Sequence, residues 1–368
     1  METLDAPQGS FRLERWRSAP RSPLRAWDAA DEYVLHHVAD TQVMGEAWLL
    51  HNDSFGALAC GLAEHEPVST GDSWTAFAAA RRNAEANGLA IADERQRSAL
   101  APGHDAVDVA VVKVPKSAAL LEDQLHRLRP RLHAASVVLG AGMARHVHTS
   151  TLQLFERIIG PTTTSRARKK ARLIHAAFAP ELSVEANPYP TRFLLPTGET
   201  VVNHANVFSR DRLDVGTRLL LDHLPDVAGR AVDVGCGSGI ISLRLAAANP
   251  AVALVLRDDS FHAVASARET LGLAGLVADI EAGDGLDGIG DGSVDAVISN
   301  PPFHDDHAVG DEVAWSIFTG ARRALRDGGE LRIVGNRHLD YHVKLKRIFG
   351  NVEVVASNPK FVVLSSTR

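Results

Sequence analysis

The sequence predicts an α/β protein made of two tandem domains, each with a parallel sheet covered by helices. The chain has 368 residues, 45% of them hydrophobic, which is enough for two separate cores. Short apolar runs alternate with Ala-rich helical stretches in both halves, a pattern typical of parallel sheets. Several short motifs also occur once in each half at nearly constant spacing.

The first half contains the weaker version of this alternation. Residues 1–28 carry Arg, Pro and Ser without an apolar core segment, so we expect a flexible arm there. The first domain is expected at 29–180. Its predicted strands are 47–50, 107–112 and 136–139, and its predicted helices are 74–87 and 120–128. Residues 181–200 are rich in Pro and turn formers, which predicts a linker.

The second half, residues 201–368, repeats the alternation more clearly. Its predicted strands are 231–234, 253–256, 295–299 and 330–334, and its predicted helices are 240–248, 261–271 and 313–325. Two apolar runs at 352–356 and 360–364 are separated by Ser-Asn-Pro, which predicts an antiparallel hairpin at the end of the C-terminal sheet.

The recurring motifs favour an internal duplication. Asp295, in the run Val-Asp-Ala-Val-Ile, lies 187 residues after Asp108, in the run Val-Asp-Val-Ala-Val. Residues 72–74 and 259–261 match at the same spacing, and 157–160 and 347–350 match at a spacing of 190. The alternative is two unrelated α/β domains of similar periodicity.

A glycine-rich turn carries the first chemical signal. Residues 233–239 read Asp-Val-Gly-Cys-Gly-Ser-Gly, follow a predicted strand and open a helix, so their backbone can approach a ligand closely. No Lys-Ser/Thr follows, and the spacing is not that of a dinucleotide loop. The leading carboxylate would repel a pyrophosphate but suits an ammonium group. We predict a cofactor site at Asp233, Gly235, Cys236, Gly237 and Gly239.

Two further acids follow the next predicted strands. Asp258 ends the second strand, where a carboxylate can accept both hydroxyls of a ribose; Asp259 is the alternative. Asp284 follows the next strand and could reach an adenine amino group, although a solvated loop acid fits the pattern equally well. Open parallel sheets bind ligands at the carboxyl ends of their strands, so these acids are predicted beside the glycine turn.

The second chemical signal is the run Asn300-Pro301-Pro302-Phe303-His304, which follows the strand 295–299. The Asn300 and Pro301 carbonyls could both accept hydrogen bonds from one –NH2 group. Two such acceptors hold a conjugated amine toward sp3 geometry and aim its lone pair at an activated methyl group. Phe303 offers a face for a base. We therefore predict amine methylation that depends mainly on positioning.

The first half has lost both signals. Residues 51–56 (His-Asn-Asp-Ser-Phe-Gly) occupy the place of the glycine turn, with Asn52 and Ser54 instead of two glycines, and 113–116 (Lys-Val-Pro-Lys) replace the Asn-Pro-Pro-Phe run. This domain is therefore expected to bind no cofactor. Its densest basic cluster could contact RNA phosphates or be a solvated helix face; the cluster consists of Arg166, Arg168, Lys169, Lys170 and Arg172.

The two motifs together resemble the bacterial ribosomal RNA guanine-N2 methyltransferases. That resemblance implies two tandem Rossmann-like methyltransferase domains, the first degenerate, S-adenosylmethionine as cofactor, and ribosomal RNA as substrate. The runs 207–211 and 213–217 together are similar to a segment that precedes the glycine turn and lies over the cofactor in that family, which implies a contact at Phe208. The C-terminal run 335–364 resembles the large-subunit branch more than the small-subunit branch, so 23S RNA is the expected target.

Composition limits the remaining possibilities. The formal net charge is −6, so any RNA contact must come from a local basic patch. The two cysteines and the His spacing predict no metal site, and no apolar run is long enough for a membrane span. We expect a cytoplasmic monomer. Alternatives are methylation of small-subunit RNA, of adenine or of a protein glutamine, and a noncatalytic RNA-binding or ribosome assembly factor.

Overall fold

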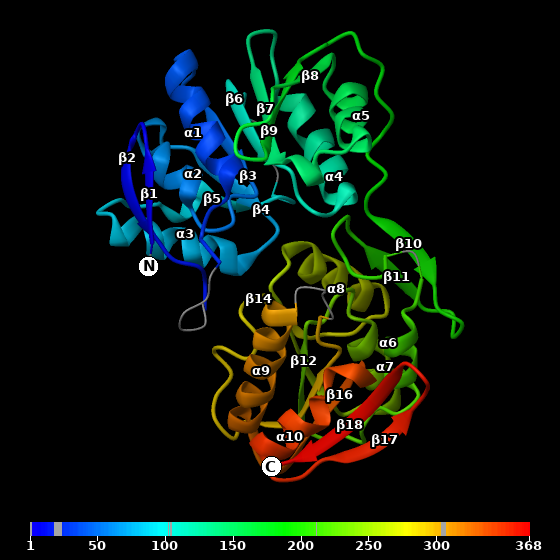
Figure 1. Cartoon of the computed structure of the whole chain (residues 1–368). Helices are drawn as coiled ribbons and strands as arrows, with labels where there is room; N and C mark the ends of the chain where they lie inside the picture. Colours follow the sequence, from blue (N-terminus) through cyan, green and yellow to red (C-terminus); the bar gives the residue numbers. More distant parts are fainter. Residues whose placement is uncertain (1, 18–23, 102, 104, 211, 303–306) are drawn as a thin grey trace. The chain divides into compact units, whose positions relative to one another are not determined.

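The chain folds into two compact units. The computed structural model describes residues 2–17, 24–101, 103, 105–210, 212–302 and 307–368. Residues 1–189 form the first unit and 190–368 the second. Each unit contains one seven-stranded sheet with helices on both faces (Figure 1). The predicted α/β class, including the antiparallel end of the C-terminal sheet, is confirmed.

The first sheet has the order β5-β4-β3-β6-β7-β9-β8. Strands β3 to β7 run parallel, and β9 is antiparallel to both β7 and β8. The strands are β3 (Trp48–His51), β4 (Val68–Gly71), β5 (Gln96–Ser98), β6 (Val109–Lys113), β7 (Val137–Met143), β8 (Thr162–Thr164) and β9 (Ala171–Ala177). The helices are α1 (Ala29–Thr41), α2 (Ala57–Gly61), α3 (Trp74–Ala86), α4 (Ala118–Leu128) and α5 (Thr149–Ile158).

The second sheet has the order β14-β13-β12-β15-β16-β18-β17, and its last two strands form the predicted hairpin. The strands are β12 (Arg230–Val234), β13 (Ala253–Asp258), β14 (Asp279–Ala282), β15 (Val294–Ser299), β16 (Leu325–Asn336), β17 (Glu353–Ser357) and β18 (Phe361–Thr367). The helices are α6 (Val215–Leu221), α7 (Ile240–Ala248), α8 (Phe261–Leu273), α9 (His307–Ala324) and α10 (Tyr341–Phe349).

The two sheets share one topology, and matching residues make matching contacts. Asp108 accepts a hydrogen bond from the backbone N–H of Ala47 at the start of β3, and Asp295 accepts one from Arg230 at the start of β12. Ser73 and Ser260 cap α3 and α8 in the same way. Strand order and local contacts therefore both support an internal duplication.

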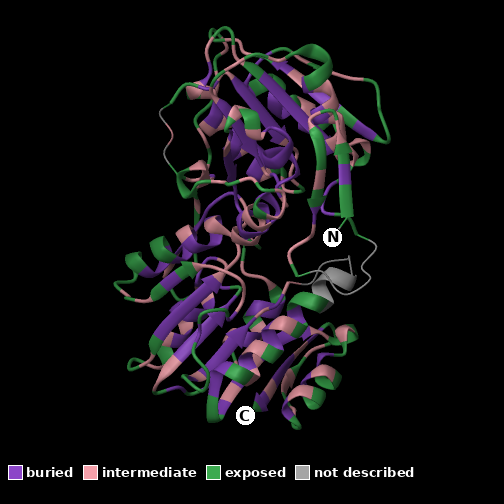
Figure 2. Cartoon of the chain, turned by 90° about the vertical axis from the view of Figure 1, so that its left-hand side faces the viewer, coloured by how far each residue is buried: buried purple, intermediate pink, exposed green. Residues whose placement is uncertain are grey.

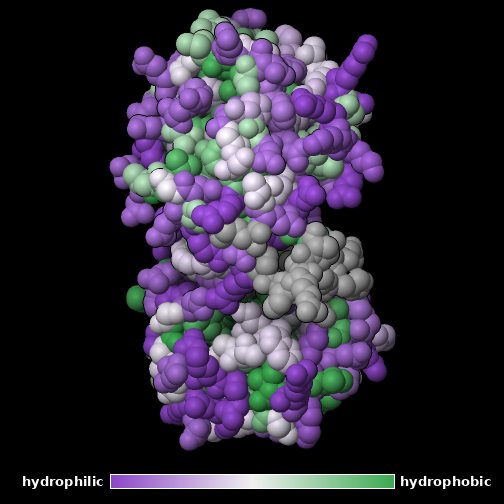
Figure 3. All heavy atoms as spheres, turned by 60° about the vertical axis from the view of Figure 1, so that its left-hand side comes forward, coloured by the Kyte–Doolittle hydropathy of each residue, from purple (hydrophilic) through white to green (hydrophobic). Residues whose placement is uncertain are grey.

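The cores lie on both faces of each sheet. The strands are largely buried, whereas the helices alternate between buried and exposed residues, as expected when helices cover a parallel sheet (Figure 2). The surface visible in Figure 3 is mostly hydrophilic, with hydrophobic residues scattered among the polar ones. No described helix is long and apolar enough to cross a membrane.

The expected flexible arm is wrong for most of its length. Residues Glu2–Ala6 (β1) and Gly9–Leu13 (β2) form an antiparallel hairpin. Leu4 and Leu13 are each only 1% exposed, within the core of the first unit. Asn83 of α3 also hydrogen-bonds both backbone groups of Glu14. The apolar residues are too few to show a strand pattern, but they pack into the same core as α1 and α2.

The expected linker at 181–200 is also only partly correct. Its second half belongs to a hairpin of the second unit, formed by β10 (Thr191–Leu194) and β11 (Thr200–Asn203). Val201 and Val202 are fully buried, and the Thr270 hydroxyl of α8 accepts from the backbone N–H of Val202. The Pro and Gly content that suggested a linker belongs instead to the turns around a small, packed hairpin.

Candidate active site

The glycine turn between β12 and α7 combines a left-handed backbone conformation with open space. Gly235, Gly237 and Gly239 have φ angles of +69°, +53° and +79°, values that residues other than glycine rarely adopt. A Cβ on Gly239 would lie 2.7 Å from Leu271 Cδ1 of α8, so this glycine permits helix packing. A Cβ on Gly235 or Gly237 would meet no described atom within 4 Å, so these two glycines border open space.

Asp233 lies in the strand immediately before this turn, almost completely buried. Its Oδ2 accepts hydrogen bonds from the Ser242 hydroxyl at 2.8 Å and the Ser242 backbone N–H at 3.2 Å. Its Oδ1 is buried without a partner among the described residues. Burial raises the pKa of Asp233 to about 7, and the neighbouring Asp258 adds to this effect. Buried acceptors in folded proteins nearly always have a hydrogen-bond partner, which makes this oxygen a candidate contact for a ligand.

Asp258 stands at the carboxyl end of β13 and contacts the same turn. Its Oδ2 accepts from the Gly237 backbone N–H at 2.9 Å. The Gly283 N–H donates to the Asp258 carbonyl, which brings the segment carrying Asp284 to the same edge of the sheet. The guanidinium of the preceding residue, Arg257, pairs instead with Asp279 and Glu281 of the neighbouring strand β14.

Cys236 and Phe208, the two other predicted cofactor contacts near this turn, differ in exposure. The Cys236 side chain is buried, and burial raises the pKa of its thiol well above the ordinary value, so it serves as a small apolar group. Phe208 is 63% exposed. Its expected contact with a cofactor stays a prediction.

Asn300 follows β15, the strand beside β12, so it lies at the same edge as the glycine turn. Its side-chain Nδ2 donates to the Thr217 hydroxyl at 2.9 Å, while Oδ1 is buried without a partner among the described residues. Pro301 is buried and Pro302 half-buried. Phe303 lies outside the described residues, so its stacking role stays a prediction.

Sequence reasoning included Thr217 in the run 213–217 but gave it no role in the site; the residue lies in the first turn of α6. Asp214, the N-cap of that helix, accepts from the backbone N–H of Thr217 at 3.0 Å. The available signal was the duplication: Asp28 caps α1, and Asp31 follows it at the same interval as Thr217 follows Asp214. Each of these two residues lies 186 positions before its counterpart.

The comparisons with known proteins cover the whole chain. A family described as "RLMG N-terminal domain" matches residues 1–180, and one described as "Methyltransferase small domain" matches 198–365. A protein of Streptomyces coelicolor, "Ribosomal RNA large subunit methyltransferase G", is 50% identical over 99% of this chain and 100% of its own length. This chain belongs to the ribosomal RNA large subunit methyltransferase G family.

Other members and a solved structure agree with this assignment. The Klebsiella pneumoniae member is 47% identical over 97% of this chain and 96% of its own. A Thermus thermophilus 16S rRNA N2 G1207 methyltransferase, solved with AdoMet and guanosine, is 21% identical and has a TM-score of 0.78 over 100% of this chain and 97% of its own. At that identity the likeness supports the fold. The family assignment makes the chain a methyltransferase.

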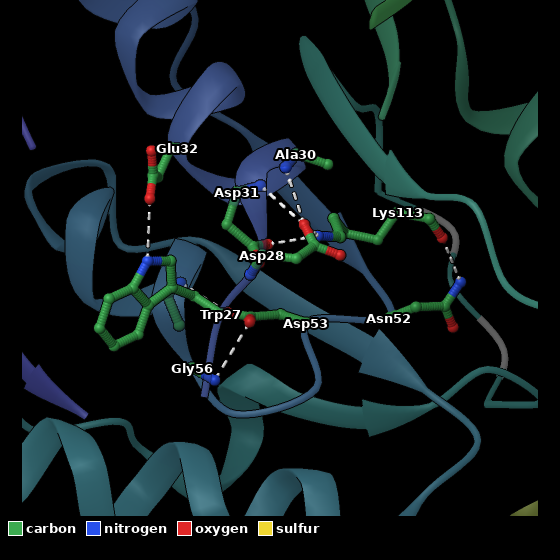
Figure 4. A network of polar contacts seen from close by, with 10 residues as sticks. Trp27, Asp28, Ala30, Asp31, Glu32, Asn52, Asp53, Gly56 and Lys113 are labelled. Carbon is green, nitrogen blue, oxygen red and sulfur yellow. Dashed lines mark hydrogen bonds and ion pairs between the residues drawn. The ribbon is translucent and has the colours of Figure 1, made fainter. Parts of the chain in front are cut away.

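In the first unit, polar side chains contact one another at the positions that match the second unit's site. Asn52, with φ of +64°, stands where Gly235 stands in the second unit. Lys113 takes the place of Asn300, and its ammonium lies 2.8 Å from Asp28 Oδ1 and 2.6 Å from Asp31 Oδ1 (Figure 4). Asn52 Nδ2 donates to the Lys113 carbonyl and to Gln124. The expected loss of cofactor binding in this unit stays a prediction.

The basic cluster of the first unit is not on a helix, so the helix-face interpretation is wrong. Backbone hydrogen bonds join Arg168 and Ala171 in both directions, and Lys169 and Lys170 have positive φ, a pattern typical of a tight hairpin turn. All five basic side chains are exposed. Lys169 is partly neutralised by Glu32, 2.6 Å away.

Among the described residues, no three His, Cys, Asp or Glu side chains gather in a way that could hold a metal ion.

Proposed function

We propose that the second unit transfers a methyl group from S-adenosylmethionine to the exocyclic N2 amine of a guanine in large-subunit (23S) ribosomal RNA. The names of relatives that are 47–50% identical over nearly the whole chain support the RNA and the subunit. The observation that carries the chemistry is Asn300 Oδ1, a buried acceptor without a partner among the described residues at the end of β15. An –NH2 group is the partner it lacks.

The residues around the glycine turn fit this cofactor. S-adenosylmethionine supplies a methyl group already activated on a sulfonium. Gly235 and Gly237 leave room for it beside the backbone, and Asp233 Oδ1 offers a buried acceptor to its ammonium group. Asp258, at the carboxyl end of β13, is assigned to the ribose hydroxyls, and Asp284 to the adenine amino group.

The chain's own residues orient the amine. The Asn300 side-chain carbonyl and the Pro301 carbonyl each accept one hydrogen of the guanine –NH2, which turns its lone pair toward the methyl group. The proton leaves after transfer, so no strong base is required at this site. Positioning supplies most of the rate enhancement.

The first unit is the proposed RNA-binding part. The exposed turn 166–172 lies at the end of the sheet where β7 finishes, since the Ala144 N–H donates to the Lys170 carbonyl. Burial lowers the pKa of His146, and the nearby charges of Arg145, Lys116 and His148 lower it further, so these basic residues gather around one point. Arg145 and Lys116, which sequence reasoning missed, extend the cluster toward a phosphate-binding surface.

A labelling experiment tests the function. Purified protein would be incubated with methyl-labelled S-adenosylmethionine and unmodified 23S RNA, 16S RNA or assembled subunits, followed by digestion to nucleosides. Labelled N2-methylguanosine from 23S RNA is expected. Label in 16S RNA, in methyladenosine or in protein would identify one of the other amine targets, and no transfer to any substrate would favour a noncatalytic role.

A further inference from the structure

Side-chain hydrogen bonds connect Asn300 to Thr217 and Thr217 to Asp214. Its side-chain Nδ2 donates to Thr217 Oγ1 at 2.9 Å, and Thr217 Oγ1 lies 3.5 Å from Asp214 Oδ2. The Thr217 side chain is 8% exposed, so bulk water competes little for these contacts. Asp214 is fixed in turn, because the same carboxylate oxygen accepts the Thr217 backbone N–H as the cap of α6.

The chemistry of the three groups gives these hydrogen bonds a direction. A carboxylate oxygen accepts hydrogen bonds, so the 3.5 Å contact, although long for an O–H···O bond, favours a Thr217 hydroxyl hydrogen directed at Asp214. The hydroxyl oxygen is then left to accept, and only the –NH2 end of the Asn300 amide can donate to it. The two ends of an amide have almost the same shape, so this polarity decides which end faces the substrate.

The matching residues of the first unit are also in contact, but different groups donate and accept the hydrogen bonds. There, Asp28, Asp31 and Lys113 occupy the places of Asp214, Thr217 and Asn300. The Lys113 ammonium donates to both carboxylates, so this position offers a substrate no acceptor. Both units thus have a contact between the start of a helix (α1 or α6) and the end of a strand (β6 or β15). The chemistry of this contact differs between the two units.

We propose that Thr217, held by Asp214, is a positioning residue that fixes the Asn300 amide with Oδ1 toward the target amine. This inference rests on the proposed function and deepens it. If the amide were reversed, its –NH2 would face the –NH2 of the guanine, and two donors would meet without an acceptor. Thr217 therefore acts on the reaction only through Asn300.

Replacing Thr217 with Val removes the hydroxyl but keeps the side-chain shape and the backbone N–H that Asp214 caps. The kcat for methylation of 23S RNA should fall about tenfold or more, because loss of one oriented hydrogen bond is worth roughly a factor of ten. Affinity for S-adenosylmethionine should stay within about twofold. Thr217→Ser restores a hydroxyl and should recover most of the rate. Thr163→Val, at an exposed position of β8, is the matched control.

A double variant separates positioning from a general structural effect. In an Asn300→Ala background, Thr217→Val should cause no further loss of kcat, because the group that it orients is gone. Equal losses in both backgrounds, or wild-type kcat in Thr217→Val alone, would overturn the inference.

A measurement without RNA keeps this inference separate from the proposed function. In protein labelled with 15N-asparagine, the side-chain –NH2 signal that disappears in Asn300→Ala should shift and lose protection from hydrogen exchange in Thr217→Val, but not in Thr163→Val. If the wild type methylates no RNA, the proposed function fails while this result still decides the orientation. An unchanged Asn300 signal in Thr217→Val would contradict the orientation itself.

Discussion

At the scale of single residues, Asn300 is the side chain on which the proposed chemistry depends most. Asn300→Ala removes the buried acceptor at the end of β15 but leaves the glycine turn intact. The methylation rate should fall by about 10²-fold or more, as for the loss of one preorganised hydrogen-bonding group at a reacting centre. Single-turnover kinetics would measure the rate, and calorimetry would measure cofactor affinity. A large loss of cofactor affinity would show that Asn300 belongs to the cofactor site instead.

Asp233 should make cofactor binding depend on pH. Burial raises the pKa of this carboxyl to about 7, so most molecules are protonated there at pH 6. A bound ammonium group favours the ionised form and lowers that pKa, so affinity should rise with pH up to about 7 and then level off. Between pH 6.0 and 7.5 the gain should be several-fold, up to about tenfold.

The matched control for this effect is Asp233→Asn, which keeps the shape but cannot ionise. Calorimetric titration of both proteins across the same pH range should give a flat profile for the variant. A wild-type affinity that falls as pH rises would mean that the carboxyl does not face a cationic group.

At the scale of elements, the N-terminal hairpin should be part of the stability of the first unit. Leu13→Ala removes a side chain that is 1% exposed and leaves a cavity, so the free energy of unfolding of this unit should fall by about 2–5 kcal/mol. Leu24→Ala, at a position 46% exposed, should change it little. Urea unfolding followed by tryptophan fluorescence compares the two. Equal effects would mean that the hairpin is only loosely attached.

The sequence predicts those parts of the fold that depend on local pattern. The central parallel strands follow from periodicity, and both chemical motifs lie where the strand-to-loop pattern puts them. No range was predicted for the short strands β4, β5 and β14 or for the helices α1, α5, α6 and α10. The arm and the linker were misjudged because β1, β2, β10 and β11 are short strands whose stability comes from contacts distant in sequence, such as those of Asn83 and Thr270.

Site residues that lie within a short sequence motif were predictable, whereas residues that only folding brings to the site were not. Asp233, the glycines and Asn300 stand in recognisable motifs. Thr217 is an ordinary helical residue, and its contact with Asn300 spans 83 positions. Arg145 and Lys116 likewise lie near the basic turn only because the strands β6 and β7 pair in the sheet. Each of these residues belongs to a separate segment that follows one of the two strands.

At the scale of the whole molecule, the two units should divide RNA binding and chemistry between them. Replacing Arg166, Arg168, Lys169 and Lys170 with Ala should weaken RNA binding and flatten its salt dependence by about 0.7–0.9 per lost phosphate contact. Lys169 should contribute least, since Glu32 already pairs with it. Cofactor affinity should not change.

Filter binding at several salt concentrations would measure these slopes. Replacing Lys344, Lys346 and Arg347 of α10 together with Lys360 by Ala also removes four positive charges and is the control for a simple change in net charge. If both variants have the same effect, RNA is attracted by general charge and not by the turn at 166–172.

The Lys113 cluster of the first unit opposes the introduction of the second unit's site residues at the matching positions. Asparagine at 113 would leave Asp31, which is buried, and Asp28 close together without their cation, and removing one partner of a buried ion pair typically costs about 3–5 kcal/mol. Threonine at 31 would leave the Lys113 ammonium with Asp28 as its one remaining carboxylate partner of the two. Either single substitution is therefore expected to destabilise the first unit, and a second catalytic centre there would need several coordinated substitutions.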